Sequence, residues 1–210
     1  MTKHRITVSA PPSLTGPDLL EAHQPRAISF HVPYSAPGRL ENLATAEKHG
    51  HARAGGPFAK QVEKYLATLT GARQVALTTS CTAAMEVAAL ALGLKPGDEV
   101  IVPTFTFCAS ASAFERTGAK IVFCDIDPET LMMDPTDLER RITSKTRAIV
   151  VVHYGGALAN MERICLLAET RGIDVVEDAA QAVGVSRHGR AAGTFGTFGA
   201  YSFHETKVVS

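Results

Sequence analysis

The sequence predicts an α/β fold in which a mostly parallel β-sheet lies between layers of helices. Short apolar runs alternate along the 210-residue chain with longer stretches of helical character, which is typical of strand–helix–strand units. Several runs are apolar at every position, so both faces of those strands are expected to be covered, as in parallel sheets. The runs expected to form strands span residues 75–77, 100–102, 121–123, 148–152 and 173–176.

Helix-breaking residues and apolar spacing predict the helices. Pro57 suits the first position of a helix and Gly71 suits its end. We therefore expect a helix over 57–70 with one buried face. The apolar residues of that face are Phe58, Val62, Tyr65, Leu66 and Leu69. The remaining helices are expected over 82–94, 105–117, 135–142 and 161–171.

The two ends of the chain differ from its middle. Residues 1–27 hold four prolines and no sustained periodicity, so we expect an irregular arm there and one large domain over 28–210. After Ser186, glycines at positions 189, 193, 196 and 199 separate short pieces that we expect to form antiparallel strands completing the sheet. Their G-x-x-G-x-x-G spacing is not the G-x-G-x-x-G of dinucleotide-binding loops, so no Rossmann nucleotide site is predicted.

Charge and hydropathy argue against several classes of protein. The 21 Lys and Arg offset 21 Asp and Glu, which gives no electrostatic reason to expect nucleic-acid or membrane-surface binding. No apolar run approaches the ~18 residues of a spanning helix, and the first residues lack the apolar stretch of a signal peptide. We expect a cytoplasmic protein with neither nucleic-acid nor membrane partners.

The four cysteines predict neither a metal site nor a disulfide framework. They form no C-x-x-C pair, and a chain of this length needs no disulfides to fold. Each lies among apolar neighbours, so buried thiols acting as small hydrophobic side chains are expected at Cys81, Cys108, Cys124 and Cys165.

Ligands of open α/β sheets bind beyond the carboxyl ends of the strands. After the first expected strand, Ser80, Cys81 and Thr82 open a helix, where free amides, the helix dipole and hydroxyl groups suit a phosphate. The alternative is a simple N-cap. After the second strand come Phe105 and Phe107, where an aromatic ring either stacks on a flat ligand or belongs to the core.

Two acids follow the fifth apolar run. Glu177 and Asp178 are costly to bury without partners, so at least one has a partner or a function, or caps the next turn. Asp178 and Gln181 are one turn apart and suit a common ligand. Lys207 follows an aromatic segment, where desolvation makes an amine nucleophilic; the alternative is a solvated lysine.

Together these residues supply what pyridoxal 5'-phosphate (PLP) needs: a lysine, an acid for the pyridine nitrogen, a stacking ring and an anion site. The motifs that hold them are SCTAAMEVAAL, PGDEVIVPTFTF, VVHYGG, VVEDAAQAVG and YSFHETK. In this order they resemble the DegT/DnrJ/StrS family of PLP-dependent nucleotide-sugar aminotransferases, with the aspartate-aminotransferase-like (fold-type I) fold. The resemblance covers residues 28–207. Within the family it is similar to the TDP-4-oxo-6-deoxyglucose 4-aminotransferases, whose loops also read SCTA and SFHETK.

The resemblance implies a role for each matching residue. Lys207 matches the lysine that forms a Schiff base with PLP, Asp178 the partner of the pyridine nitrogen, and Gln181 the group beside the ring hydroxyl. Phe107 matches the stacking aromatic, and Ser202 a phosphate ligand. The start of the phosphate loop is matched by Ser80, Cys81 and Thr82. Many family members have glycine in place of Cys81, but the SCTA pattern accommodates it.

The resemblance also implies an activity. It predicts a transaminase that moves an amino group from an amino acid, glutamate by preference, to a 4-keto nucleotide-linked deoxysugar in polysaccharide biosynthesis. A homodimer is expected for a full-length member. Because family members continue well beyond the lysine, we expect the large domain to be incomplete, the small C-terminal domain to be missing, and the chain alone to be inactive. The rivals are the sugar dehydratase branch, in which the lysine is replaced, and a catalytically dead fragment or non-enzymatic interaction domain.

Overall fold

The parallel sheet expected from the sequence is present in the computed structural model, which describes residues 32, 35–50, 55–207 and 209. Neighbouring strands are parallel throughout, in the order β2-β1-β3-β4-β7. The strands are β1 (Glu99–Pro103), β2 (Lys120–Cys124), β3 (Thr146–Val152), β4 (Asp174–Asp178) and β7 (Phe198–Ala200). The chain divides into Met1–Val32 and Pro33–Ser210, and the sheet belongs to the second unit. The expected arm over 1–27 lies outside the described residues, as does the expected start of the domain at residue 28.

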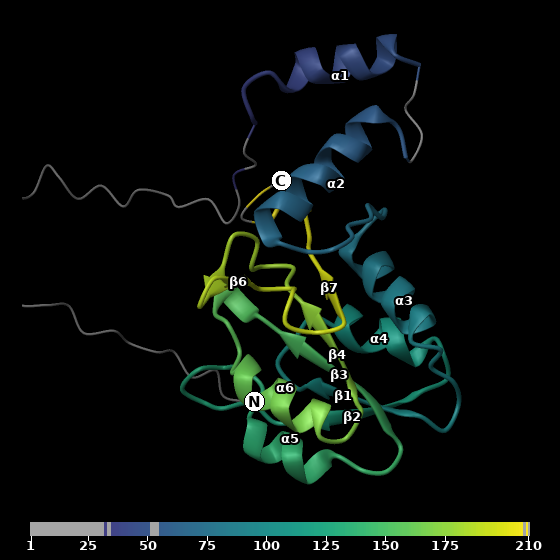
Figure 1. Ribbon diagram of the computed structural model, residues 1–210, viewed down its shortest axis with the longest axis vertical. Helices are drawn as coiled ribbons and strands as arrows, with labels where there is room; N and C mark the ends of the chain where they lie inside the picture. The colour runs from purple at the N-terminus through teal and green to yellow at the C-terminus, as the bar shows by residue number, and fades with distance from the viewer. Residues whose placement is uncertain (1–31, 33–34, 51–54, 208, 210) are drawn as a thin grey trace, which may run out of the picture. The chain divides into compact units, whose positions relative to one another are not determined.

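Helices cover both faces of the sheet (Figure 1). On one face lie α3 (Cys81–Ala91) and α4 (Ala109–Glu115), and on the other α5 (Pro135–Arg141) and α6 (Met161–Glu169). Successive strand residues point to opposite faces, which produces two separate cores. The first contains Val100, Val102, Ala148, Val150 and Val176, and the second contains Ile101, Ile149, Val151 and Val175. The predicted layers are therefore confirmed, although α4 begins at Ala109 rather than at 105.

Two further helices precede the sheet. Helix α2 (Pro57–Thr70) begins and ends where the sequence predicts, and Gly71 ends it with a φ of 74°, a conformation that glycine adopts without strain. Its apolar side chains are only partly covered within the described residues: Leu66 is buried, whereas Tyr65 is 66% exposed. Helix α1 (Arg39–Lys48) was not expected; no residue of it is buried, so it lacks the apolar stripe that would have predicted it.

Two expected strands differ from the structure. Residues 75–77 join no strand in the described part of the chain; the Leu77 N–H instead donates to Glu63 Oε1 at 3.2 Å. The pieces after Ser186 were expected to complete the sheet as antiparallel strands. Instead β5 (Ser186–Arg187) and β6 (Arg190–Ala191) form a separate antiparallel hairpin, and β7 joins β4 in parallel. The connection over 179–197 is long enough for this crossover.

The cysteines are all free, and their burial differs from the expectation. Cys124 is buried, Cys81 and Cys165 are half-buried, and Cys108 is exposed. The prediction of a buried thiol is wrong for Cys108, which lies at the N-cap of α4 beyond the end of β1. No helix within the described ranges is long and apolar enough to cross a membrane.

Candidate active site

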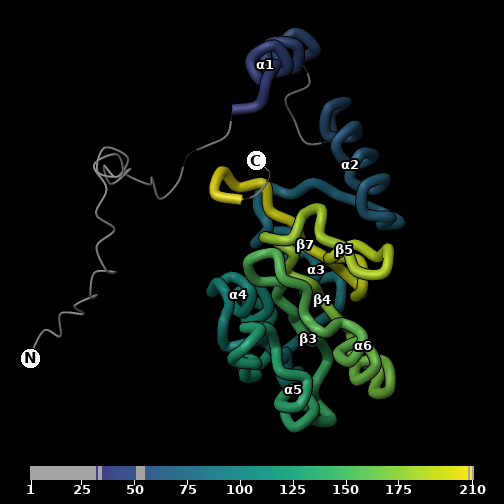
Figure 2. Tube along the Cα trace, turned by 90° about the vertical axis from the view of Figure 1, so that its left-hand side faces the viewer, coloured from purple at the N-terminus to yellow at the C-terminus, as the bar shows by residue number. Residues whose placement is uncertain are grey.

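Most of the predicted site residues follow the carboxyl ends of the parallel strands, which meet at one edge of the sheet. Strand β1 ends at Pro103, β4 ends at Asp178, and β7 ends at Ala200. In Figure 2 the yellow segment after β7 continues past the end of that strand toward the C-terminus. Helix α3 contacts both β4 and β7, so its start lies at the same edge. The parallel arrangement therefore brings together residues that are far apart in the sequence.

The start of α3 combines an N-cap with free amides. The Ser80 hydroxyl accepts a hydrogen bond from the Ala83 N–H at 3.0 Å, and the Thr78 hydroxyl donates to the Ser80 carbonyl at 2.8 Å. Neither the Cys81 N–H nor the Thr82 N–H has an acceptor within the described residues. Ser80 is thus an N-cap, and the two amides after it remain available to an anion at the positive end of the helix dipole.

Asp178 is held by one side chain from another element and by one backbone N–H. It is 5% exposed; its Oδ2 accepts from the Ser110 hydroxyl at 2.6 Å and its Oδ1 from the Ala180 N–H at 3.1 Å. Ser110, itself fully buried in α4, also shares a 2.7 Å hydrogen bond with the Thr106 hydroxyl. The sequence reasoning missed Ser110 and Thr106. The available signal was two hydroxyl residues four apart, directly after β1 at the ligand-binding edge.

Gln181 is oriented by the backbone after β3. Its Oε1 accepts from the Gly155 N–H at 2.7 Å, which leaves its Nε2 group as a donor. The two aromatic residues after β1 differ in role. Phe105 packs against Tyr154 with ring centroids 4.3 Å apart, whereas Phe107 is 70% exposed and so is not a core residue. An exposed ring at this edge is available for stacking.

Lys207 stands in a turn that follows β7. Ser202 is buried, and its hydroxyl accepts from the His204 N–H at 3.3 Å. The Lys207 N–H in turn donates to the His204 carbonyl at 2.8 Å. The Lys207 side chain is half-buried, whereas 203–206 are exposed. This partial burial disfavours the alternative that Lys207 is a fully solvated lysine.

Two charged groups of the site affect the pKa of the Cys81 thiol. Burial and, to a smaller extent, the negative charge of Asp178 raise the pKa of Cys81 to about 12, while the positive charge of Lys207 acts in the opposite direction. These two effects agree with the placement of Asp178, Lys207 and the start of α3 at one edge of the sheet. A thiol with this pKa stays protonated at neutral pH and is not a nucleophile.

The second acid, Glu177, has partners of its own. It points to the opposite face of the sheet from Asp178, as alternation along β4 requires. There it is fully buried together with His153, whose Nε2 lies 2.8 Å from Glu177 Oε2. The prediction that at least one of the two acids has a partner is confirmed for both.

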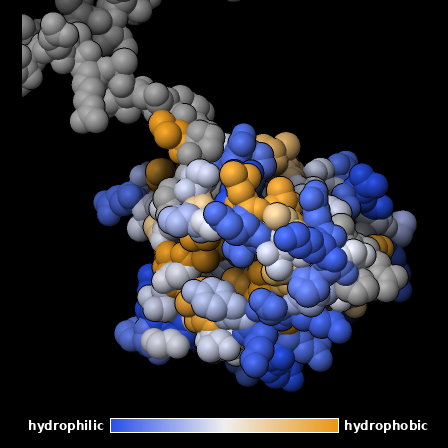
Figure 3. All heavy atoms as spheres, turned by 90° about the horizontal axis from the view of Figure 1, so that it is seen from above, coloured by the Kyte–Doolittle hydropathy of each residue, from blue (hydrophilic) through white to orange (hydrophobic). Residues whose placement is uncertain are grey.

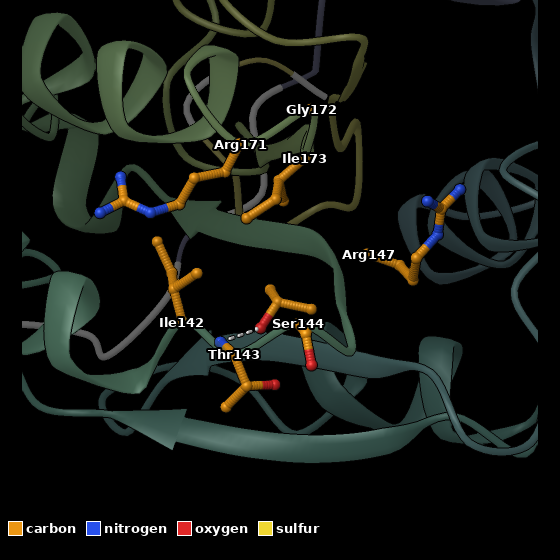
Figure 4. Close-up of a pocket in the computed structure, with 8 residues that line it drawn as sticks. Ile142, Thr143, Ser144, Arg147, Arg171, Gly172 and Ile173 are labelled. Atoms are coloured by element: carbon orange, nitrogen blue, oxygen red, sulfur yellow. Dashed lines mark hydrogen bonds between the residues drawn. The ribbon is translucent and has the colours of Figure 1, made fainter.

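A separate depression lies at the other edge of the sheet. It has a volume of about 460 Å³ and is lined by residues around the amino ends of β3 and β4, among them Thr143, Arg147 and Arg171. Figure 4 shows the guanidinium groups of these two arginines pointing away from each other rather than toward a shared ligand. The dashed line there is the hydrogen bond from the Thr143 N–H to the Thr146 hydroxyl, 2.9 Å long. This depression is therefore not part of the site described above.

The residues at the carboxyl edge fit PLP. The two free amides at the start of α3 suit its phosphate, and the exposed ring of Phe107 suits its flat pyridine ring. Asp178 is a buried carboxylate that suits a protonated pyridine nitrogen, Gln181 offers a donor, and Lys207 offers an amine. The donor set is thus complementary to an anionic, aromatic aldehyde.

Comparison with known proteins agrees with this site. The model of the DegT/DnrJ/EryC1/StrS aminotransferase family matches residues 34–210. The spore coat polysaccharide biosynthesis protein SpsC of Bacillus subtilis (strain 168) is 43% identical over 152 residues, which are 72% of this chain and 39% of SpsC. GDP-perosamine synthase of Escherichia coli O157:H7 is 40% identical over 155 residues, which are 74% of this chain and 43% of the synthase.

A solved structure shows the same fold. Spr1654 from Streptococcus pneumoniae, named as a sugar aminotransferase, matches in its PMP form with a TM-score of 0.83 and 30% identity over 88% of this chain and 50% of that one. Its PLP form matches with a TM-score of 0.80. The family resemblance and the aminotransferase fold expected from the sequence are confirmed. The chain spans about half the length of these relatives, or less.

Proposed function

The chain belongs to the DegT/DnrJ/EryC1/StrS aminotransferase family, and from this membership we propose that the protein is a PLP-dependent transaminase acting on nucleotide sugars. The amino group passes from an amino acid, glutamate by preference, to a 4-keto nucleotide-linked deoxysugar. The names of two relatives, a polysaccharide biosynthesis protein and GDP-perosamine synthase, support a sugar of this class. The proposal includes a cytoplasmic location.

One observation carries the proposal: the convergence of Asp178, Lys207 and the start of α3. These groups come from three neighbouring elements: Asp178 ends β4, Lys207 follows β7, which pairs with β4 in parallel, and α3 packs against both strands. A carboxylate, an amine and a helix N-terminus at one sheet edge are needed together for PLP. A lysine, an acid or a helix start alone would have an ordinary structural explanation.

The chain's own residues divide the task of binding. The N–H groups of Cys81 and Thr82 would hold the phosphate, with the hydroxyl of Ser80 at the start of the same helix and that of Ser202 on the segment after β7. Phe107 would stack on the pyridine ring. Gln181, whose oxygen is already engaged by Gly155, donates through Nε2 to the ring hydroxyl.

Two residues handle protons. PLP, when bound, supplies the electron sink that allows the amino group to be transferred. The Asp178 carboxylate would hold a proton on the pyridine nitrogen, and its hydrogen bonds to Ser110 and Ala180 fix it in place. The Lys207 Nζ would move a proton at the carbon that carries the amino group.

We propose a homodimer for the whole protein. The support is the apolar surface that α2 exposes: Val62, Tyr65 and Leu69 are 42%, 66% and 46% exposed, and they recur at helical spacing. Because the relatives are about twice as long as the chain, these statements concern the whole protein.

Reductive trapping tests the assignment of Lys207. PLP-loaded protein is reduced with borohydride, digested and mapped, and the pyridoxyl group is expected on Lys207. Lys60 and Lys64, which lie on α2, serve as internal controls and should remain unlabelled. Labelling of either α2 lysine while Lys207 stays free would overturn the assignment.

An activity assay separates the rival functions. With glutamate and a 4-keto nucleotide sugar, an aminotransferase releases 2-oxoglutarate and an amino sugar, and a dehydratase releases a deoxygenated sugar. With the whole protein, a catalytically dead fragment or interaction domain gives neither product and, after PLP is added, shows no absorption band beyond that of free PLP.

A further inference from the structure

Glu177 is a buried anion with a complete set of donors. Its side chain is fully buried, and its Oε2 accepts from the Gly193 N–H at 2.8 Å and from His153 Nε2 at 2.8 Å. Its Oε1 accepts from the Gly196 N–H at 2.6 Å. Because His153 Nδ1 accepts from the Ala159 N–H at 3.3 Å, the ring carries its proton on Nε2 and donates it to Glu177. Three donors from two segments thus converge on one carboxylate.

Close packing around Glu177 explains the G-x-x-G-x-x-G spacing of 193–199. Gly193 has a φ of 86°, and a Cβ there would lie 2.7 Å from the Tyr201 hydroxyl. A Cβ at Gly196 would overlap the Val175 carbonyl, and one at Gly199 would overlap the Gly193 carbonyl. Each glycine therefore allows a close approach of backbone to neighbour. The spacing marks a loop folded tightly over β4 around the Glu177 carboxylate.

The same loop determines the course of β7. Gly199 is the register partner of Glu177 in the β4–β7 pair. Beyond the strand, the Tyr201 hydroxyl donates to the Ala192 carbonyl, at the start of the loop. Ser202 and Lys207 follow Tyr201 on one short segment, of which 203–206 are exposed. The contacts that hold Lys207 at the active-site edge therefore run back through Tyr201 and the loop to Glu177.

We propose that Glu177 is a positioning residue for Lys207: its buried carboxylate holds the loop 192–197 against β4 and so places β7, Ser202 and Lys207 at the active-site edge. The inference rests on the proposed function for the role of Lys207. Glu177 itself faces the opposite side of the sheet from Asp178 and does not touch the reacting groups. A neutral amide of the same size cannot replace it, because an NH₂ group would face N–H donors.

The first test measures where Lys207 lies without any cofactor. Competitive acetylation with acetic anhydride, read by mass spectrometry, compares the rate at Lys207 in the wild-type chain, in Glu177→Gln and in the control Glu169→Gln. Glu169 is an exposed residue at the end of α6. Local opening of the loop in Glu177→Gln is expected to raise Lys207 acetylation about 3- to 10-fold, and Glu169→Gln should match the wild type.

The second test uses PLP. In Glu177→Gln, the fraction of bound PLP that borohydride fixes to Lys207 should fall about 3- to 10-fold. Total PLP bound before reduction should change less than about 2-fold, since the α3 amides and Asp178 are intact. A variant that had merely lost its fold would lose both. If even the wild type fixes no PLP to Lys207, the proposed function fails, while the acetylation rates still test the positioning role.

A milder variant keeps the proposal falsifiable should Glu177→Gln not fold. Tyr201→Phe removes only the hydroxyl that joins β7 to the loop, and it is expected to raise Lys207 acetylation by a smaller factor, about 2-fold or more. The proposal is overturned if Glu177→Gln folds and acetylates Lys207 at the wild-type rate. It is equally overturned if Glu177→Gln does not fold and Tyr201→Phe leaves that rate unchanged.

Discussion

The Asp178 carboxylate combines near-complete burial with a hydrogen bond to each of its oxygens. Ser110 and Ala180 supply the donors, from α4 and from the backbone just after β4. These two hydrogen bonds fix the orientation of the Asp178 carboxylate. Asp178 is thus prepared for a cationic partner at the sheet edge.

In the whole protein, Asp178→Asn is expected to reduce turnover by a factor of about 100 or more while changing PLP retention by less than about 10-fold. The amide no longer stabilises a proton on the pyridine nitrogen, but the phosphate contacts at α3 and the Lys207 amine are unaffected. Single-turnover amination and equilibrium dialysis with PLP measure the two effects. A variant with wild-type single-turnover rates would show that the carboxylate serves only to cap the turn at Ala180.

The thiols provide a second prediction about single residues. Burial raises the pKa of Cys81 and of Cys124 to about 12 in each case, whereas Cys108 is exposed. Because the thiolate is the reactive form, Cys108 should react with iodoacetamide at pH 8 at least about 100-fold faster than Cys81 or Cys124. Mass spectrometry of timed samples measures the rates. In urea the differences in alkylation rate should disappear. If Cys81 in the folded protein is alkylated as fast as Cys108, the burial of the Cys81 thiol is contradicted.

Only those site residues that lie in recognisable motifs could be predicted from the sequence. Asp178, Gln181 and Lys207 are predicted site residues because they stand at strand ends or in a family motif. Ser110 is not, since its bond to Asp178 joins residues 68 apart in the sequence. The pair of hydroxyl residues after β1 indicates the ligand-binding edge but does not reveal Asp178 as the partner. That partner follows only from the fold, which brings Ser110 of α4 within hydrogen-bond distance of the end of β4.

The elements that depend on local pattern were predicted well. Helix α2 and strands β1, β2, β3 and β4 follow from apolar periodicity and from helix-breaking residues. The failures involve long-range pairing. Residues 75–77 have the apolar composition of a strand, yet no strand pairs with them in the described residues. The direction of β7 depends on its crossover, which composition does not reveal.

Helix α5 contains a buried acid that gives the fold a measurable pH dependence. Asp137 is 5% exposed, and the Asp125 N–H donates to its Oδ2 at 2.8 Å. Arg141 and Arg140 add bonds of 3.0 and 3.2 Å. The Asp125 N–H, followed by the two arginines, lowers the pKa of Asp137 to about 2 from an ordinary 3.8. The ionised carboxylate thus ties β2 to α5.

A depressed pKa stabilises the fold above the unfolded value, and this contribution is lost as the pH falls from about 4 to about 2. Asp137→Asn should lower the free energy of unfolding at pH 7 by about 1–2 kcal/mol, a value reduced because both arginines are partly exposed. Urea unfolding at pH 7 and pH 3 measures this. The variant should show a shallower loss between the two pH values, and Glu129→Gln, at an exposed position, should behave as the wild type. An unchanged pH dependence in Asp137→Asn would disprove the role of this carboxylate.

At the scale of the whole chain, much apolar surface remains uncovered. Figure 3 shows hydrophobic residues, in orange, among hydrophilic ones on the face seen from above. Among the described residues, Tyr65 on α2, Leu90 on α3 and Phe107 at the site are each at least 66% exposed. Exposed apolar surface on this scale marks interaction sites. The relatives, about twice as long as this chain, contain further sequence that could cover it.

The last prediction follows from the exposure of the site and of the segment before Lys207: the 210 residues alone should bind PLP weakly and show no appreciable turnover. An amine must be held to about 0.5 Å for catalysis, but 203–206, which carry the chain to Lys207, are exposed. Water also reaches the site at the uncovered carboxyl edge of the sheet, and the electrostatic interactions of the site are weakened unless water is excluded. The α3 amides and Asp178 are intact, so PLP binding should survive the loss of turnover.

The measurement compares the 210-residue chain with a chimera extended by the C-terminal half of SpsC, both assayed with glutamate and a 4-keto nucleotide sugar. The chimera should be active and sediment as a dimer, and the short chain should bind PLP without forming amino sugar. Equal activity of the two would show that the exposed segment before Lys207 needs no further support. If neither is active although both bind PLP at Lys207, the error lies in the sugar substrate rather than in the site, because covalent capture at Lys207 does not depend on the sugar.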